Sequence, residues 1–329
     1  MIFKHSKFIK TVIPLALAAA LMAAGCSFRQ NELPDDTDAT QQTKGSEAVN
    51  TTLPADTQPN AEEAQKKAMD GFNSLVAGNP TPQQLMKYLS ENLQAVKPED
   101  ASAMVLKLEE VQIISMTPLE TKYSSESIQK KLWDGWKTDF DLNAAINTED
   151  AELKALLEET RDGGYKVETA EGSFFPIMDY GAYKGFSPFV TADIKAYIDL
   201  MAVESDKVPA KDAALVISWE DVLKRAVNQE KFLADYPDSL KLERVRDLYS
   251  QYLTFAFMGL NNTPAFDYDS KAMVPDLKAA YKNFLSSSTD QRLGQRFRNF
   301  VDILEKSGYK LSKEVEDYRK TAVEVPLGG

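Results

Sequence analysis

The sequence predicts a mainly α-helical protein, a helical bundle or an irregular α-solenoid, with one short β-hairpin near residues 165–178. Two observations support this fold class. From Ala61 onward, apolar residues recur with the period of a helix, and turn-forming residues separate the stripes. One segment alternates instead, and Glu171-Gly172 in its middle suits a hairpin turn. We expect nine to eleven helices without a repeat of fixed period.

Four of these helices carry clear local signals. Pro98 suits a first helical position, and the acids after it suit a first turn. Ser218 with Asp221 resembles a capping box. Asp238-Ser239 is expected to begin a helix that stops at Gly259, since glycine is common directly after a helix. The fourth stripe comprises Leu293, Phe297, Phe300, Val301 and Leu304.

The N-terminus has the pattern of an export signal. The first ten residues carry three lysines and no acid, and residues 11–25 are uncharged and almost wholly apolar. A segment of this length is shorter than the ~20 residues that a transmembrane helix needs. The ending Ala23-Ala24-Gly25-Cys26 resembles the lipobox of bacterial lipoproteins, although leucine is commoner than alanine at the first of these positions. The resemblance implies cleavage before Cys26 and attachment of diacylglycerol, with palmitate-type acyl chains, to its thiol.

A polar segment follows Cys26. It is rich in Asp, Thr, Gln, Asn and Pro and too poor in large apolar residues to fold. This composition predicts a flexible tether. The double glycine at 163–164 is the best candidate for a boundary between two helical regions. The predicted organisation is therefore a signal peptide (1–25), the lipidated cysteine and its tether (26–60), an N-terminal helical region (61–162) and a C-terminal helical region with the hairpin (163–329).

Composition excludes several kinds of chemistry. The only histidine, His5, and the only cysteine, Cys26, both lie in the N-terminal segment. The folded part therefore lacks the imidazole of a Ser-His-Asp triad and the usual ligands of zinc, copper and haem. The loop starting at Asp267 lacks the glycine and the glutamate of a calcium-binding EF-hand. We expect no metal and no cofactor. The formal net charge of −12 argues against nucleic acid as a partner.

Residues 174–197 are unusually rich in aromatic side chains, with carboxylates and glycines among them. Aromatic faces beside carboxylates suit sugar rings or peptide side chains. The ligand-binding candidates are Phe175, Asp179, Tyr180, Tyr183 and Phe186. The alternative is that these rings pack the hairpin against neighbouring helices.

Glu204-Ser205, at the end of a predicted helix, is the candidate catalytic feature. It resembles the catalytic Glu-Ser pair of lytic transglycosylases, in which a carboxyl group with a raised pKa protonates the glycosidic oxygen. The Gly-Leu-Met-Gln stretch expected downstream is absent, because VPAKDAALVISW (208–219) stands there. The alternative is an ordinary surface acid.

The segment from EGSFFPIMDY to NNTP (171–264) resembles uncharacterised surface lipoproteins of Gram-positive bacteria. The favoured hypothesis is a lipoprotein held on the outer face of the cytoplasmic membrane, or on the outer membrane of a Gram-negative cell. It would act as a non-enzymatic binding or scaffolding module for a cell-wall component or an envelope protein. The alternatives are a solute-binding lipoprotein of a transporter and a carboxylate-dependent peptidoglycan hydrolase that uses Glu204.

Overall fold

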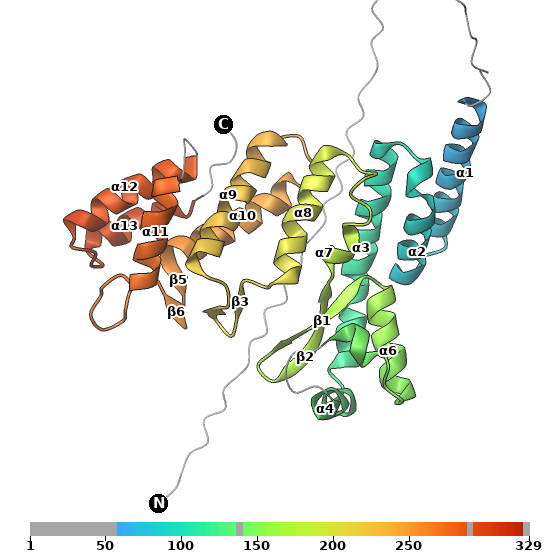
Figure 1. Cartoon of the computed structure of the whole chain (residues 1–329), viewed down its shortest axis with the longest axis horizontal. Helices are drawn as coiled ribbons and strands as arrows, with labels where there is room; N and C mark the ends of the chain where they lie inside the picture. The colour runs from blue at the N-terminus through green and yellow to red at the C-terminus, as the bar shows by residue number, and fades with distance from the viewer. Residues whose placement is uncertain (1–57, 136–140, 288–291, 325–329) are drawn as a thin grey trace, which may run out of the picture. The chain divides into compact units, whose positions relative to one another are not determined.

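Helices make up most of the chain in the computed structural model, which describes residues 58–135, 141–287 and 292–324 (Figure 1). The predicted signal peptide, Cys26 and nearly all of the tether lie outside these residues. The helices are α1 (Gln58–Ala77), α2 (Pro82–Asn92), α3 (Pro98–Tyr123), α4 (Glu126–Gly135), α5 (Leu142–Ala145), α6 (Ala151–Asp162), α7 (Tyr180–Tyr183), α8 (Ala192–Asp206), α9 (Trp219–Asp235), α10 (Leu242–Met258), α11 (Pro275–Ser287), α12 (Arg292–Lys306) and α13 (Lys313–Ala322), with a 3-10 turn η1 (Leu93–Ala95).

Strands form only two-stranded antiparallel sheets in the described part of the chain. The pairs are β1 (Tyr165–Ala170) with β2 (Ser173–Met178), β3 (Ala210–Lys211) with β4 (Ala214–Leu215), and β5 (Gly259–Leu260) with β6 (Thr263–Pro264). The β1–β2 turn is made by Glu171 and Gly172, both at positive φ, as the favoured two-residue hairpin turns require. The mainly α fold and its hairpin near 165–178 are thus confirmed.

Local signals explain where several helices begin. Thr81 caps α2 through a complete capping box with Gln84, and α3 starts at Pro98 as predicted. Ser218 caps α9 by accepting a hydrogen bond from the Asp221 backbone N–H. The described residues contain more helices than the nine to eleven expected, because α5 and α7 are single turns of four residues that no periodic stripe marks.

The predicted start of one helix is wrong. Helix α10 begins at Leu242 instead of at Asp238-Ser239, although it ends before Gly259 as expected. The Ser239 hydroxyl donates to the Asp193 carboxylate at the start of α8 and accepts from the Lys241 backbone N–H. This side chain therefore connects α8 to the turn before α10 and caps no helix itself.

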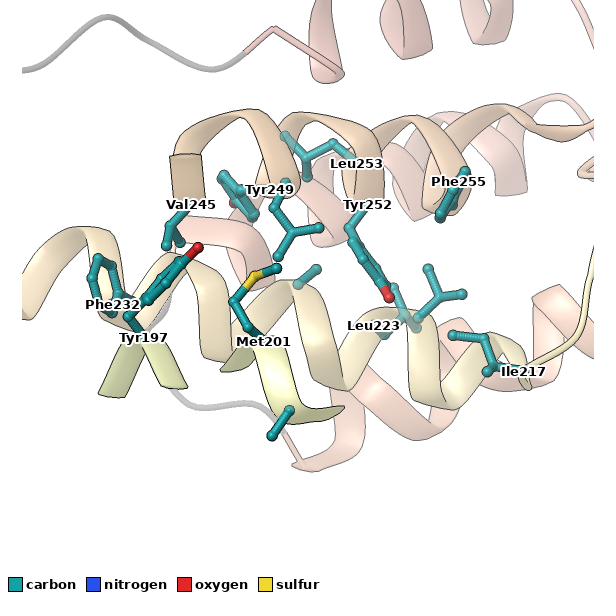
Figure 2. Packing of buried hydrophobic residues seen from close by; sticks show 14 of the residues in the cluster. Tyr197, Met201, Ile217, Leu223, Phe232, Val245, Tyr249, Tyr252, Leu253 and Phe255 are labelled. Carbon is teal, nitrogen blue, oxygen red and sulfur yellow. The ribbon is translucent and has the colours of Figure 1, made fainter. Parts of the chain in front are cut away.

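The main hydrophobic core includes side chains from both sides of the double glycine, so the described residues belong to one compact unit. Its central part lies among α8, α9 and α10 (Figure 2). Residues labelled there include Tyr197, Met201, Leu223, Phe232, Val245, Tyr249, Tyr252 and Leu253. A smaller core packs the β1–β2 hairpin on α4, α6 and the C-terminal part of α3. No helix among the described residues is long and apolar enough to span a bilayer.

A buried polar cluster crosses the main core. Glu109 of α3 accepts hydrogen bonds from the hydroxyls of Tyr180 and Tyr197, each at 2.6 Å, through Oε1. Its Oε2 forms an ion pair with Lys241, which precedes α10. One carboxylate thereby joins three segments that are distant in sequence, and its charge is compensated as a buried charge must be.

Two buried glutamines differ in how well their amides are satisfied. Gln112 donates to the Gly163 carbonyl at 2.6 Å and accepts from the Tyr183 hydroxyl. Gln229, a residue that is 1% exposed, has no hydrogen-bond partner for Nε2 or Oε1 among the described residues. A buried polar group without a partner costs roughly 1–3 kcal/mol.

We therefore expect Gln229→Leu to raise the free energy of unfolding by about 1–3 kcal/mol, measured by urea denaturation. Gln112→Leu is the matched control, because it removes the same amide from a satisfied site and should lower stability. A loss of stability in both variants would contradict this account of Gln229.

Candidate functional site

The aromatic candidates of the sequence lie mostly inside the core. Tyr180, Tyr183 and Phe186 are buried and form a chain of ring contacts, with centroids 5.2 and 5.8 Å apart. Their burial agrees with the alternative that these rings pack the structure. Asp179 is partly exposed and caps α7 through the Gly181 backbone N–H. Phe175 is half-buried on β2, opposite Glu168.

The other candidate, Glu204, lies in a groove. The groove has a volume of about 430 Å³ and runs between α8 and α9. Helix α8 contributes Ala196, Asp199, Leu200, Val203 and Glu204, and the segment of α9 and its C-terminal cap contributes Arg225, Asn228, Lys231, Phe232, Asp235 and Tyr236. Because the α8 residues are three or four positions apart, they share one face of that helix.

Two side chains hold the Glu204 carboxylate, which is 12% exposed. Oε2 accepts from the Tyr252 hydroxyl at 2.6 Å and from Arg225 Nη1 at 3.2 Å. Arg225 also donates to the Lys207 carbonyl at 2.9 Å, which fixes its guanidinium. No described residue donates a hydrogen bond to Oε1, so this oxygen keeps its full capacity as an acceptor.

Burial raises the pKa of Glu204 above the ordinary glutamate value, although Tyr252 and Arg225 both act to lower it. Desolvation is the larger effect because most of the side chain is removed from water. The hydroxyl that donates to it is affected as well, since burial and the nearby Glu204 charge raise the pKa of Tyr252.

The raised pKa predicts a pH dependence of stability. A folded-state pKa above the unfolded value means that the folded protein binds the Glu204 proton more tightly. This stabilisation is complete below the unfolded pKa of about 4.3 and is lost as pH rises through the folded pKa. The free energy of unfolding of the wild type minus that of Glu204→Gln should therefore fall with rising pH above about 4.3. Urea denaturation across this range measures it, and a difference that rises with pH would contradict the prediction.

Sequence reasoning missed the partners of Glu204. A signal existed for Arg225, because it lies between Leu223 and Ala226 on the buried side of α9, where a charge needs a partner. Tyr252 lies among the buried apolar residues of α10, and the sequence gives its hydroxyl no separate signal. In the sequence, Asn228 and Tyr236 have the pattern of ordinary surface positions. Only the packing of α8 against α9 places them in the groove.

No cluster of three or more metal-ligating His, Cys, Asp or Glu side chains occurs in the part of the chain that the structure describes. Comparison of the chain with protein-family models, with curated proteins and with solved structures finds no match.

Proposed function

We propose that this protein is a membrane-anchored extracytoplasmic lipoprotein that acts as a non-enzymatic binding module of the cell envelope, with the groove between α8 and α9 as its binding site. The observation that carries the binding role is the groove itself. It combines an apolar wall with a few polar groups that the fold leaves available, which is the usual composition of a ligand site.

The anchoring part of the proposal rests on the sequence. A basic start, an apolar stretch, the lipobox-like ending at Cys26 and a polar tether occur in the order that a bacterial lipoprotein requires. Diacylglycerol supplies two acyl chains, and stable anchoring needs about two membrane signals. Cys26→Ser should therefore abolish attachment of the lipid, measured by mass spectrometry of the protein recovered from the membrane fraction. A lipid mass that remains on the variant would contradict lipid anchoring through this residue.

A peptidoglycan hydrolase is the second candidate, and one observation favours it. Glu204 lies in a groove, and the pKa of its carboxyl group is raised, as a general acid requires. Its Oε2, however, is engaged by Arg225 and Tyr252. Glycosidases also use a second carboxylate, and the other acids of the groove, Asp199 and Asp235, are each paired with a lysine four residues earlier. A binding role therefore fits the arrangement better.

The solute-binding alternative receives less support. Solute-binding lipoproteins usually have two α/β lobes, and α/β folds are built around parallel sheets. The sheets among the described residues are all short antiparallel pairs.

The experiment that tests the proposal uses the full chain, purified in detergent, mixed with intact peptidoglycan sacculi. The sacculi are sedimented and the supernatant is analysed by mass spectrometry. Co-sedimentation without released fragments is the expected result. Release of muropeptides that Glu204→Gln abolishes would establish the hydrolase instead. A protein that stays in the supernatant and releases nothing would contradict a wall-binding role.

A further inference from the structure

The charged groups of the groove are paired within the protein. Arg225 pairs with Glu204 at 3.2 Å and Lys231 with Asp235 at 2.6 Å, while Asp199 pairs with Lys195 at 2.6 Å. Every charged side chain that lines the groove therefore has an opposite charge beside it. A charged ligand would compete with one of these partners, whereas a neutral ligand would not.

The remaining polar groups can both donate and accept hydrogen bonds. The side-chain amide of Asn228 and the hydroxyl of Tyr236 have no hydrogen-bond partner among the described residues, and Glu204 Oε1 is an additional acceptor. A site that offers both donors and acceptors suits a ligand whose hydroxyl or amide groups also donate and accept hydrogen bonds.

The apolar surface lies beside these groups. Leu200 and the exposed Val203 line the groove from α8, and the half-buried ring of Tyr236 lines it from the end of α9. From Ala196 to Glu204 the helix advances about 12 Å, which is longer than one sugar ring. A pyranose ring presents an apolar C–H face to an aromatic ring and hydroxyl groups at its edge, so it matches both parts of this surface.

From this arrangement we infer that the groove binds a neutral glycan strand, of the N-acetylhexosamine class that occurs in cell walls. The inference rests on the proposed function and specifies its ligand. In this arrangement a sugar ring packs on Tyr236 and the α8 side chains, and the hydroxyl and acetamido groups of the strand bond to Asn228, to the Tyr236 hydroxyl and to Glu204 Oε1.

The test is titration calorimetry of the detergent-purified full chain with a linear tetramer of N-acetylglucosamine. We expect saturable binding that Tyr236→Ala weakens about tenfold, the loss of one aromatic contact together with a hydrogen bond. Asn228→Ala, at an exposed position that should not disturb folding, is expected to weaken it about threefold or more. Tyr268→Ala is the control, because Tyr268 is 60% exposed and lies outside the groove.

Three results would overturn the inference. In the first, the chain co-sediments with sacculi and binds a wall stem peptide, but it does not bind the tetramer. This result would leave the proposed function intact. The second is an equal loss in the Tyr268 and Tyr236 variants, which would indicate binding outside the groove. The third is that neither sacculi nor tetramer binds, in which case the wall-binding function itself fails.

Discussion

Glu109→Ala is expected to lower the free energy of unfolding by about 3–5 kcal/mol, the usual cost of removing one partner from a buried ion pair. The substitution leaves the Lys241 ammonium without its carboxylate in a largely buried position. It also removes the acceptor of two buried hydroxyls, those of Tyr180 and Tyr197. Denaturation in urea at neutral pH measures the loss.

Two variants make this result specific. Glu110→Ala, at the neighbouring exposed position, breaks only a surface ion pair with Lys107 and should cost no more than about 1 kcal/mol. The double variant Glu109→Leu with Lys241→Met replaces the pair by apolar side chains and should recover part of the loss. Equal stability of the Glu109 and Glu110 variants would contradict the role of this carboxylate in joining α3, α8 and the start of α10.

Gly259→Ala is expected to lower the melting temperature by at least about 6 °C, which corresponds to about 3 kcal/mol for a folded unit of this size. Gly259 follows α10 with φ 76° and ψ −159°, a region that is essentially restricted to glycine. An added Cβ would lie 2.5 Å from both the Ala265 nitrogen and the Thr263 oxygen. Both atoms belong to backbone, so they cannot move aside as a flexible side chain would.

Gly308→Ala provides the matched control, measured by the same thermal unfolding. Gly308 also has a positive φ, 62°, but no atom lies within 4 Å of an added Cβ. Its substitution should cost only the conformational term of about 1–2 kcal/mol. Similar melting temperatures for the two variants would show that the close approach at Gly259 is relieved by local movement.

The fold class and many element positions could be predicted because their causes are local. A helical stripe such as Leu293, Phe297 and Phe300 needs only its own periodicity, and all three side chains are fully buried. The hairpin needs only alternation and the Glu171-Gly172 turn. The start of α10 could not be predicted, because Ser239 bonds to Asp193, which is 46 residues away, and no local pattern reveals that contact.

The site could be predicted only in part, for the same reason. Sequence reasoning selected Glu204 by its position at a helix end, but its environment depends on Arg225 and Tyr252, which are 21 and 48 residues away. It selected Tyr180 and Tyr183 by aromatic density. Their burial follows from the contacts of their hydroxyls with Glu109 and Gln112 on α3, 71 residues earlier in both cases. Density alone does not distinguish a ring in a core from a ring in a groove.

The measurement that tests the central claim most directly compares two exposed valines. Val203 is 44% exposed and lines the α8–α9 groove, whereas Val216 is 42% exposed and lies outside it. Glutamate at either position adds the same charge to an already acidic chain, so general repulsion from the wall is matched. In co-sedimentation with sacculi, we expect Val203→Glu to abolish binding and Val216→Glu to bind as the wild type does. Equal binding by both variants would contradict the assignment of the groove as the binding site.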